Sequence, residues 1–569
     1  MKPLNLHQVP FSRFGSYMAF SMFDGRGGRA EIPAIPAGLY FRTIRGNAAQ
    51  RELFRVELVR NGEPIPMTIN ASPASLILNA EGAKATLVFP KPDILQMQVE
   101  GATLRFTLAL PVRPYRYEFA IPLGINRWQM NIWPNIHNYL FTTQTGSLTV
   151  TAPWNGSHCD GITADFGPGE SAIEEFRSTC PPGKYPPFEE IKGRAGNLFS
   201  DWLKRTLPAP AEYGETRELG AYLNWATVVN PCEKLTRPAM YMSKNWMTNI
   251  WSWDHCFNAL ALAKADPDLA WDQFMVMFDF QDADGALPDS VNDRMALWNF
   301  VKPPVHGWTI NRFLRRNELA FADRLKEAYE PLARWTNWWM EHRDSDGDGI
   351  PEYNHGNDSG WDNATVFGDG CPVEASDLTT YLIIQMDTLA DIANRLGKAS
   401  ESTKWKEKSR ALLERFMKHS WKNERFVSPR AGSHAVAPGD SLIDWMPLIL
   451  GSRLDGATRK ILLEEVSREG RFLTRHGLAT ENPAGKFYVS DGYWLGPIWA
   501  PPTLMLTDAL AEAGNTALAS RITRSYCDMC AREGFAENFD ALTGSGYRDR
   551  AYTWTSSVFL LLAETLNQP

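Results

Sequence analysis

A short polar stretch, residues 357–363, contains the side chains of this chain best suited to acid–base chemistry. It carries two carboxylic acids, Asp358 and Asp362, and Trp361 directly precedes Asp362. An indole beside a carboxyl group lowers the local dielectric, which raises the pKa of the acid, and it offers a flat apolar surface to a ring-shaped ligand. A carboxyl group that stays protonated near neutral pH can protonate a leaving oxygen. The alternative is a solvated turn in which an aspartate caps a helix.

A second candidate segment, residues 251–257, places two indoles before Asp254. An ionised aspartate can accept hydrogen bonds from two sugar hydroxyl groups while the neighbouring Trp253 stacks on the sugar ring. The alternative is an aspartate that caps the helix expected from about residue 255. The two roles are compatible, because the carboxylate has two oxygens.

Two further loop segments carry polar and aromatic residues. Residues 285–289 end in Asp289, and residues 302–308 form a proline-stiffened segment that ends in Trp308, which suits a rigid platform for a sugar. Near the C-terminus, Glu537 follows an apolar approach and opens residues 537–544. Each segment taken alone is more typical of an ordinary surface or structural loop.

An aspartate-rich run, residues 344–352, predicts a cation site. Its oxygen-bearing residues stand at positions 1, 3 and 5, a glycine stands at position 6 and a backbone carbonyl at position 7, which is the start of a calcium loop. Position 12 is His355 instead of glutamate, so the loop is not a complete EF-hand. We expect a structural calcium ion, with an aspartate-rich turn as the alternative. The predicted ligands are Asp344, Asp346, Asp348, Ile350 and Glu352.

The composition describes a globular chain large enough for two or three domains. Its 569 residues exceed one ordinary hydrophobic core, and charged residues make up 22% and hydrophobic residues 44%. The net charge of −8 argues against a nucleic-acid partner. No run reaches the roughly 18 apolar residues that a membrane helix needs, so we expect no membrane span. The 21 tryptophans suit a large helical core or a carbohydrate site.

The cysteines indicate a reducing compartment. There are seven, an odd number, which fits free thiols better than a disulfide framework. Cys527 and Cys530 form a lone C-x-x-C, and without a second pair we interpret them as ordinary helix residues instead of zinc ligands. The first residues show no apolar core of the length that a secretion signal needs. We therefore expect a cytoplasmic protein.

The first third of the chain is rich in β-strand patterns. Glu100 and Gly101 stand between two apolar runs and predict a hairpin. Many short strands separated by proline and glycine are typical of a β-sandwich, which we place at residues 1–185. The clearest runs are residues 85–89, 94–99, 103–108 and 147–151.

The chain then becomes helical. Residues 186–214 predict a proline-rich linker with a short helix, and residues 215–569 a helical domain. In residues 377–396, apolar side chains recur mostly at steps of three and four and Gly397 follows, which predicts an amphipathic helix. About a dozen helices joined by long loops indicate a helical toroid whose loops carry the function. These loops, rich in Gly, Pro, Trp and Asp, are residues 281–310, 343–375, 425–442 and 481–502.

Together these segments resemble the inverting α-glycosidases of glycoside hydrolase family 63 and, more distantly, the trehalases. The resemblance implies a mainly α protein, in which an (α/α)6-barrel catalytic domain follows an N-terminal β-sandwich and the active site lies in loops at one end of the barrel. Seven motifs occur in the family's order: WSWDHCF (251–257), GALPDS (285–290), KPPVHGW (302–308), DGDGIPEY (346–353), GNDSGWDN (356–363), YWLGPIW (493–499) and ENFDALTG (537–544).

The resemblance also implies roles for individual residues. Asp362 corresponds to the general acid and Glu537 to the general base, and inversion places such carboxyl groups roughly 6.5–9.5 Å apart. The nearby Arg548 and Arg550 would favour an ionised Glu537. Where relatives often show Tyr-Trp-Arg-Gly-Pro, this chain has Leu495, which puts the leaving-group side in doubt. The implied sugar-binding residues are Trp253, Asp254, Asp289, Trp308, Trp361 and Trp499.

We therefore expect an exo-acting, inverting α-glycosidase that hydrolyses small carbohydrates without an organic cofactor. Short α-glucosides are the first candidates, which makes α-glucosidase the expected activity, and mannosylglycerate, glucosylglycerate or trehalose-like substrates are alternatives. Helical toroids also host phosphorylases and polysaccharide lyases. The alternative from another class is a catalytically inactive carbohydrate-binding protein. The residues carry no signal for an oligomeric state.

Overall fold

The computed structural model describes residues 2–25, 35–46, 48, 51–109, 115–133, 135–316 and 321–567. The chain divides into two compact units. The first comprises residues 1–204, 221–230 and 243–248, and the second comprises residues 205–220, 231–242 and 249–569. Compactness alone does not say which segments fold independently, so the boundaries predicted at residues 185 and 214 stay predictions.

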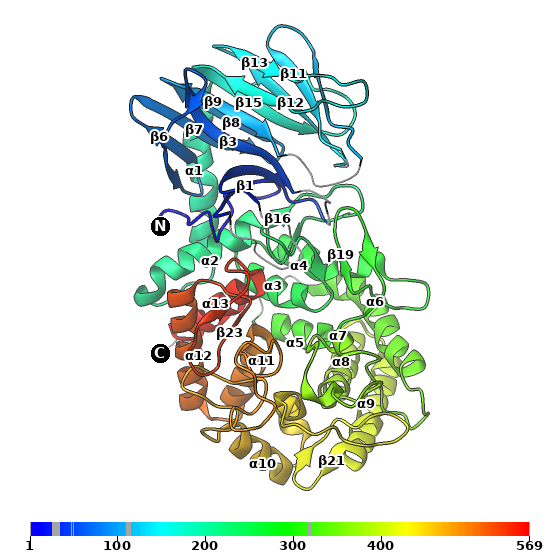
Figure 1. The fold of residues 1–569 in the computed structure, drawn as a ribbon. Helices are drawn as coiled ribbons and strands as arrows, with labels where there is room; N and C mark the ends of the chain where they lie inside the picture. The colour runs from blue at the N-terminus through cyan, green and yellow to red at the C-terminus, as the bar shows by residue number, and fades with distance from the viewer. Residues whose placement is uncertain are drawn as a thin grey trace. The chain divides into compact units, whose positions relative to one another are not determined.

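The first unit contains two antiparallel sheets, drawn in blue to cyan in Figure 1. One sheet has the order β1-β2-β3-β9-β14-β13, with β4 paired to β3, and the other has the order β10-β11-β12-β15-β8-β7-β6-β5. The strands of the first sheet are β1 (Met18–Phe23), β2 (Gly38–Thr43), β3 (Glu52–Arg60), β4 (Glu63–Pro64), β9 (Thr103–Leu108), β13 (Leu148–Thr151) and β14 (Thr163–Phe166). Those of the second are β5 (Thr68–Ala71), β6 (Leu76–Ala80), β7 (Ala83–Lys91), β8 (Ile94–Glu100), β10 (Phe119–Pro122), β11 (Arg127–Asn131), β12 (Asn138–Thr143) and β15 (Gly169–Phe176).

Aromatic rings join the inner faces of the two sheets. Phe54 of β3 lies 5.3 Å from Phe141 of β12, measured between ring centroids, and Phe106 of β9 lies 5.8 Å from the same ring. Phe41 of β2 meets Tyr139 of β12 at 5.7 Å. All five rings are buried. The alternation of apolar residues along these strands therefore builds one core between two sheets, and the predicted antiparallel N-terminal region is confirmed.

The hairpin predicted at Glu100 and Gly101 is wrong. The strands on either side of this turn, β8 and β9, belong to different sheets. Gly101 has φ +66°, and a Cβ there would lie 2.0 Å from the carbonyl oxygen of Gly82, so this position requires glycine. The turn carries the chain from one sheet to the other. Strand patterns and a turn signal predict two strands that are consecutive in sequence. They do not predict which other strands each of the two pairs with.

Helix α1 (Phe188–Arg205) follows the strands, and all but its last residue belong to the first unit. Its buried residues recur at helical spacing, and Phe188, Ile191 and Ala195 pack on Val88 of β7. The helix predicted in this region is therefore confirmed. It is an amphipathic helix held on the sheet by its apolar face. Strand β16 (Val228–Val229) also lies in this unit.

The second unit is mainly helical, which confirms the predicted helical region. Six of its segments contact one another in a closed cycle, in the order α3, α5, α8, η4, α11, α13 and back to α3. Outside them, α4 packs on α3, α6 on α5 and α8, α9 on α8, α10 on η4, and α12 on α11 and α13. The segments of the cycle are α3 (Asp254–Leu262), α5 (His306–Arg316), α8 (Ser376–Arg395), η4 (Leu442–Arg453), α11 (Ala500–Glu512) and α13 (Thr553–Thr565). The outer helices are α4 (Pro267–Met275), α6 (Phe321–His342), α9 (Ala399–Ser420), α10 (Gly456–Val466) and α12 (Thr516–Glu533).

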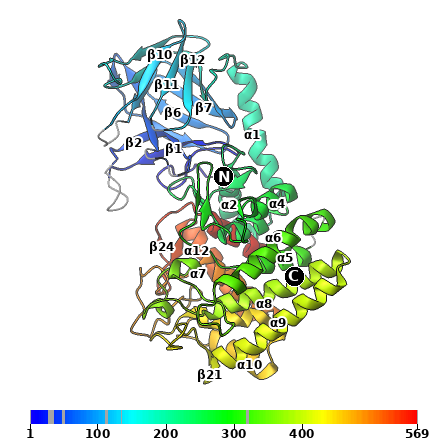
Figure 2. The same ribbon diagram turned by 90° about the vertical axis from the view of Figure 1, so that its right-hand side faces the viewer.

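Helix α8 illustrates how the cycle is built. The sequence predicts an amphipathic helix at residues 377–396, but all except four of the 20 residues of α8 are buried. The helix contacts α5, α6, α9 and η4, and its four residues that are not buried, Asp387, Asp391, Asn394 and Arg395, lie on one face near its C-terminal end. Figure 2 shows α8 and α9 lying side by side. Gly397, with φ +75°, follows the helix as predicted.

Short elements complete the loops of this unit. Helix α2 (Gly214–Ala226) begins in it. The remaining elements are η1 (Ala211–Tyr213), β17 (Ala239–Met240), β18 (Ile250–Trp251), η2 (Phe278–Phe280), β19 (Ser290–Val291), β20 (Ala296–Leu297), α7 (Gly356–Ser359), η3 (Thr365–Phe367), β21 (Trp421–Lys422), β22 (Arg425–Phe426), β23 (Asn538–Phe539) and β24 (Gly546–Tyr547).

The cysteine prediction agrees with the structure. All seven cysteines are free thiols, and Cys527 and Cys530 are buried residues of α12. Within the described residues, the model contains no helix with the length and apolar character needed to traverse a bilayer.

Candidate functional site

The predicted site residues precede the N-termini of helices in the closed cycle. Asp254 is the first residue of α3, and its N-cap position is occupied by Trp253, so the expected capping role of Asp254 is wrong. Asp289 lies in the loop before α5, Asp362 in the loop before α8, and Glu537 in the loop before α13. Residues distant in sequence therefore reach one region because consecutive helices of the cycle lie next to one another.

A short loop, residues 356–363, positions Asp362; we call it the acid loop. Helix α7 ends at Gly360, which has φ +71°. A Cβ at Gly360 would lie 2.5 Å from ring atoms of Trp253, so the backbone of the acid loop rests directly on this indole. At the other end, the side chain of Asn363 accepts from the backbone N–H of Trp494 (3.0 Å) and donates to the carbonyl oxygen of Gly492 (3.0 Å). These contacts hold the loop between α3 and the segment around Trp494.

Five indoles pack together beside the acid loop. Trp361 lies 4.7 Å from Trp494, and Trp494 stacks on Trp499 at 4.2 Å with ring planes 3° apart. Trp554 meets both Trp253 and Trp499 edge-on at 5.5 Å. All five rings are buried. Trp361 thus serves mainly as core beneath Asp362, where it contributes to the low dielectric that the sequence predicts.

Burial raises the pKa of Asp362 above its ordinary value. The positive charge of Lys302 lowers this pKa and the negative charge of Asp289 raises it. The pKa of Asp254 is raised well above its ordinary value, again mainly by burial, and Asp289 and Asp362 both contribute to the rise. The three acids and Lys302 therefore lie close enough to influence one another, and the protonated form of Asp362 is favoured.

Lys302 is a functional candidate that sequence reasoning did not single out. Its ammonium group lies 2.8 Å from the Oδ1 atom of Asp289, and it also donates to the carbonyl oxygen of Asn357 in the acid loop. Both members of the ion pair are buried. The only signal in the sequence is the lysine that opens residues 302–308, and its partner lies thirteen positions earlier.

Glu537 also lies beside the aromatic group. Its Oε1 atom accepts a hydrogen bond from the hydroxyl of Tyr493 (3.2 Å), and its carbonyl oxygen accepts from the indole N–H of Trp554 (3.4 Å). Burial raises the pKa of Tyr493 well above its ordinary value, and the charges of both Glu537 and Asp362 contribute. Tyr493 therefore lies near both predicted catalytic carboxyl groups.

A second tyrosine connects Glu537 with Asp254. Tyr552 occupies the N-cap position of α13. Burial raises its pKa well above the ordinary value, and the charges of Asp254 and Glu537 add to the rise. Tyr493 and Tyr552 could be found in the sequence only as members of aromatic motifs, since nothing in their spacing indicates contact with an acid.

The two arginines expected beside Glu537 behave differently. The guanidinium group of Arg548 lies 5.0 Å from the centroid of the Tyr493 ring and donates to the side chain of Asn538 (3.1 Å). Arg550 instead donates to the carbonyl oxygens of Glu533 and Gly546. Only Arg548 therefore belongs to the surroundings of Tyr493 and Glu537.

Trp308 lies one aromatic ring away from the other predicted residues. It belongs to the first turn of α5, and Phe257 separates it from Trp253, at 5.9 Å from Trp253 and 5.7 Å from Trp308. Its ring faces the guanidinium group of Arg312 at 5.2 Å, and both residues line a pocket with Asp508. Phe257 therefore separates Trp308 from the indole on which the acid loop rests.

Asp358, the other carboxylic acid of the acid loop, has a structural position. One carboxylate oxygen accepts from Arg343 (2.9 Å) and from the backbone N–H of Asn354 (3.0 Å), and the other accepts from the backbone N–H of Val301 (3.1 Å). With a buried side chain and every oxygen bonded, Asp358 connects three segments of chain.

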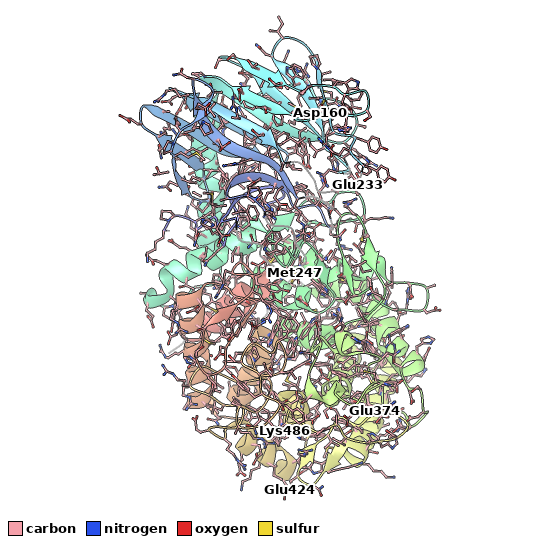
Figure 3. The ribbon with its side chains drawn as sticks, viewed as in Figure 1. Asp160, Glu233, Met247, Glu374, Glu424 and Lys486 are labelled. Atoms are coloured by element: carbon pink, nitrogen blue, oxygen red, sulfur yellow. The ribbon has the colours of Figure 1, made fainter. Side chains whose placement is uncertain are left out.

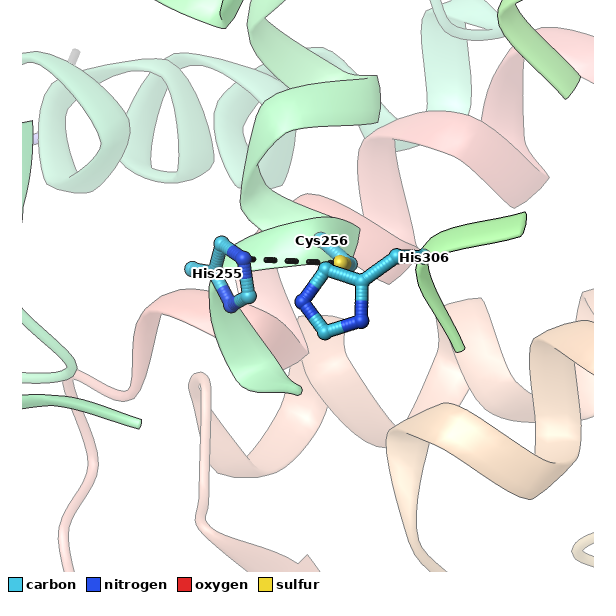
Figure 4. A group of neighbouring side chains, drawn as sticks. All are labelled: His255, Cys256 and His306. Carbon is cyan, nitrogen blue, oxygen red and sulfur yellow. Dashed lines mark hydrogen bonds between the residues drawn. The ribbon is translucent and has the colours of Figure 1, made fainter. Parts of the chain in front are cut away.

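A buried group beside Asp254 comprises His255, Cys256 and His306, drawn in Figure 4. The Cys256 sulfur lies 3.6 Å from a ring nitrogen of His255. Burial lowers the pKa of His255 to about 3 and that of His306 well below its ordinary value, so both imidazoles are neutral. The histidines pack against Phe274 and Phe278. This group belongs to the core under the site and supplies no acid or base.

The aspartate-rich loop, residues 344–352, has part of the arrangement expected for calcium. Ligand atoms of Asp344, Asp346 and Asp348 lie within 4.8 Å of one another. The carboxylate of Asp344 accepts from the backbone N–H groups of Gly347 and Gly349, each at 2.9 Å, and both glycines have positive φ. The loop therefore turns its aspartates toward one point, as the pattern predicts.

The other two predicted ligands are less clearly directed at that point. The backbone N–H of Ile350 donates to the side chain of Asp348 (2.8 Å), and the carboxylate of Glu352 accepts from the hydroxyl of Ser345 (2.9 Å). The three aspartates fit a hard cation and Glu352 is otherwise engaged. Calcium at this loop stays a prediction.

Comparison with known proteins agrees with this arrangement. The family model described as a mannosylglycerate hydrolase MGH1-like glycoside hydrolase domain matches residues 247–555. A mannosylglycerate hydrolase of Rubrobacter radiotolerans is 23% identical over an alignment that covers 54% of this chain and 89% of that protein.

Two solved structures show the relationship of the fold. The first, a GH63 mannosylglycerate hydrolase from Thermus thermophilus in complex with Tris and D-glycerate, is 20% identical with a TM-score of 0.51, over 56% of this chain and 95% of that chain. The second, a bacterial glucoamylase in complex with acarbose, is 10% identical with a TM-score of 0.61, over 99% of this chain and 94% of that chain. Since the family model matches more than half of its residues, the chain belongs to the MGH1-like glycoside hydrolases of glycoside hydrolase family 63 and is a glycoside hydrolase.

Proposed function

We propose that this glycoside hydrolase is an exo-acting, inverting α-glycosidase in which Asp362 is the general acid and Glu537 the general base. The observation that carries this proposal is the position of Tyr493, whose hydroxyl donates to Glu537 and which lies close enough to Asp362 for the charge of that acid to raise the pKa of Tyr493. We further propose that the six contacting segments of the second unit form an (α/α)6 barrel, supported by their closed cycle and by the flanking outer helices. The acids then lie at the end of the barrel formed by the helix N-termini.

The proposed reaction transfers two protons. Asp362 gives its proton to the glycosidic oxygen as the bond between this oxygen and the anomeric carbon breaks. Glu537 removes a proton from a water molecule whose oxygen bonds to the anomeric carbon from the opposite face. This requires a protonated acid, and the raised pKa of Asp362 supports that role. The room for the water corresponds to roughly 6.5–9.5 Å between the carboxyl groups.

The remaining polar residues suit recognition of sugar hydroxyl groups. Asp254 and the ion pair of Asp289 with Lys302 lie near Asp362, where carboxylates accept from hydroxyls and the ammonium group donates. We propose Asp254 and Asp289 as sugar ligands and Trp253 and Trp499 as the apolar wall of the pocket. We also propose Trp361 and Trp308 as sugar-binding residues, from the resemblance. Trp361 is buried, and Phe257 separates Trp308 from Trp253, so both indoles have packing roles in addition.

Short α-glucosides are our first proposed substrates, and glycosylglycerates are the second. Mannosylglycerate hydrolases among the relatives favour the second candidate. Its glycerate carboxylate would need a cation, and Leu495 stands where relatives often carry arginine. Arg548 lies next to Tyr493 on the side of the base, so Lys302, whose positive charge acts on Asp362, is the proposed cation on the leaving-group side. The seven free thiols support a reducing compartment, so we propose that the enzyme acts in the cytoplasm.

A screen of α-linked disaccharides, mannosylglycerate and glucosylglycerate, followed by proton NMR of the first product, tests this function. We expect release of a sugar whose anomeric carbon is initially in the β configuration, without any requirement for phosphate. An initially α-configured product would contradict inversion. Sugar binding without turnover on the whole panel would favour the catalytically inactive protein, and a product that absorbs in the ultraviolet would indicate a lyase.

A further inference from the structure

A second group of polar side chains converges outside the acid loop. Ligand atoms of its four members lie within 4.8 Å of one another. They come from four separate segments: the aspartate-rich loop, the residues just before α8, the last turn of α9, and the loop before η4. Glu374, labelled in Figure 3, marks the position of this group in the second unit. The members are Asp348, Glu374, His419 and His434.

Backbone pairing brings these segments together. Val373, beside Glu374, pairs with Tyr353 on one side and with Arg430 on the other, and Pro429 pairs with Val436. His434 lies in the turn between Pro429 and Val436. Its φ of +50° is an uncommon conformation for a residue other than glycine. The imidazole is therefore held in place by a tight turn and does not reach the group from a flexible loop.

Two of the distances from His434 exceed those of hydrogen bonds. Its Nε2 atom lies 3.7 Å from the Oε1 atom of Glu374 and 3.8 Å from the Oδ2 atom of Asp348. These separations are too long for hydrogen bonds. Two ligand atoms bound at roughly 2.0–2.2 Å to one tetrahedral metal ion lie about 3.5 Å apart, close to what is observed.

Glu374 provides an independent observation. Its side chain is completely buried, and its Oε1 atom has no hydrogen-bond partner. A buried carboxylate oxygen without a partner is costly. Its other oxygen, Oε2, lies 2.6 Å from the Nε2 atom of His419. The unpartnered oxygen points toward His434, where a metal ion would supply the missing interaction.

The charge of the group also favours a cation. Asp346 lies beside it, with its Oδ2 atom 3.1 Å from the Nε2 atom of His434. Three carboxylates, those of Asp346, Asp348 and Glu374, thus face two imidazoles. Even with both imidazoles protonated the group would keep a negative charge, and with neutral imidazoles its charge would be −3. Arg415 donates to the carbonyl oxygen of Gly349 instead of to one of these carboxylates.

A network without metal would explain part of this arrangement. A protonated His419 can donate to Glu374 and to Asp348, whose Oδ2 atom lies 3.2 Å from its Nδ1 atom. This network leaves the Oε1 atom of Glu374 without a partner. A metal ion bound by both imidazoles satisfies it.

From these observations we propose a binding site for a divalent transition-metal ion of the zinc class, formed by Asp348, Glu374, His419 and His434. Imidazole nitrogen is a common ligand of zinc and related ions, whereas calcium takes oxygen ligands almost exclusively. The site shares Asp348 with the predicted calcium loop but uses different neighbours. Its four donors come from four segments, so the bound ion ties the loops before α8 and η4 to the end of α9. The inference is independent of the proposed hydrolytic activity.

The test uses the full chain, freed of metal with a chelator and dialysed. Isothermal titration with zinc chloride should show one tight site, and calcium chloride should displace zinc only at a much higher concentration, because Asp348 is the one ligand that the site shares with the predicted calcium loop. The cobalt(II) form should show the visible absorption of a tetrahedral site. In His434→Ala, whose side chain is 41% exposed and can be removed with little loss of packing, we expect zinc affinity to fall by about 100-fold or more, because even residues that only orient a ligand contribute about 10–100-fold.

Two comparisons make the result decisive. His158→Ala removes a histidine that also lies near a carboxylate, Asp160 at 3.9 Å, but in the first unit, and it should leave zinc binding unchanged. His419→Gln keeps a polar side chain of similar size and should lose affinity as His434→Ala does. Circular dichroism confirms that each variant is folded. The proposal is overturned if the native chain does not bind zinc, or if folded His434→Ala binds zinc as tightly as the native chain.

Discussion

Two aspartate-bearing loops that both precede helix α8 surround their carboxyl groups in opposite ways. In the acid loop, Asp362 lies against a cluster of indoles and burial raises its pKa. In the aspartate-rich loop, burial would also raise the pKa of Asp346, but hydrogen bonds from the backbone N–H of Gly432 and from His434 lower it below the ordinary value. The same residue type thus has a raised pKa in one loop, as the proposed proton transfer requires, and a lowered pKa in the other, as the proposed cation binding requires. The difference comes from neighbours distant in sequence.

The largest effect should follow from removing the acid or the base. We expect Asp362→Asn and Glu537→Gln each to lower kcat/KM by about 10²–10⁴-fold, the usual contribution of general acid–base catalysis. With a substrate that carries an activated leaving group, Asp362→Asn should recover much of the rate and Glu537→Gln should not, since only the acid assists departure. Steady-state kinetics on both substrates measures this. Asp369→Asn, at an exposed position seven residues after Asp362, is the control, and a comparable loss there would remove the distinction of the acid loop.

A pair of glycine substitutions compares the packing of the two loops. Gly360 and Gly347 have similar positive φ, +71° and +76°, so alanine at either should cost about 1–2 kcal/mol in the free energy of unfolding. Only Gly360 lies against another residue, with Trp253 2.5 Å from the position of a Cβ, whereas Gly347 faces open space. Gly360→Ala should therefore cost about 1–3 kcal/mol more, as overpacking does, and should also reduce activity. Urea denaturation measures both variants, and equal costs would show that Trp253 is free to shift.

The smallest expected effect is a displacement of the pH profile. Asp362 must be protonated to act, so kcat/KM falls as pH rises through its pKa. The charge of Asp289 raises this pKa and that of Lys302 lowers it. Asp289→Asn removes the first and leaves the second, so the alkaline limb of the profile should move to lower pH. The matched control is Asp284→Asn, an exposed residue of the same loop. An unchanged limb, or a shift to higher pH, would show that these charges do not act on the catalytic acid.

Much of the site could be predicted because its residues occur in short motifs. The acid loop, the segment at Trp253 and Asp254, and the segment that begins at Glu537 were found from residue types and spacing. The contacts of Tyr493 and Tyr552 with these acids could not be found in this way, because each tyrosine reaches an acid of another loop. The ion pair of Lys302 with Asp289 could not be found either, because its two residues belong to different motifs, although Lys302 itself opens the KPPVHGW motif.

Fold predictions failed where pairing between distant segments decides the outcome. Turn residues at Gly101 indicated a hairpin, yet the two strands enter different sheets. The periodicity before Gly397 indicated an amphipathic helix, and α8 keeps a narrow polar face, yet its polar residues Thr380, Gln385 and Thr388 are buried as well, because α5, α6, α9 and η4 contact the helix. In both cases the local sequence predicts the type of element correctly. Its environment depends on the segments that pack against it, and the local sequence does not specify these.

The sequence by itself determined the two structural regions and the loops that carry the polar motifs, since helical and strand periods and short polar motifs are local properties, and its resemblance to glycoside hydrolase family 63 supplied the candidate acid and base. Only the tertiary structure decided that the carboxyl group of Asp362 lies in apolar surroundings and that the carboxyl group of Glu374 faces imidazoles. Asp362 acquires its raised pKa from burial and from the charge of Asp289, against the opposing charge of Lys302, and Glu374 acquires its histidine neighbours from α9 and the loop before η4. Burial and electrostatic interaction depend on distance in space, and folding alone brings these groups together.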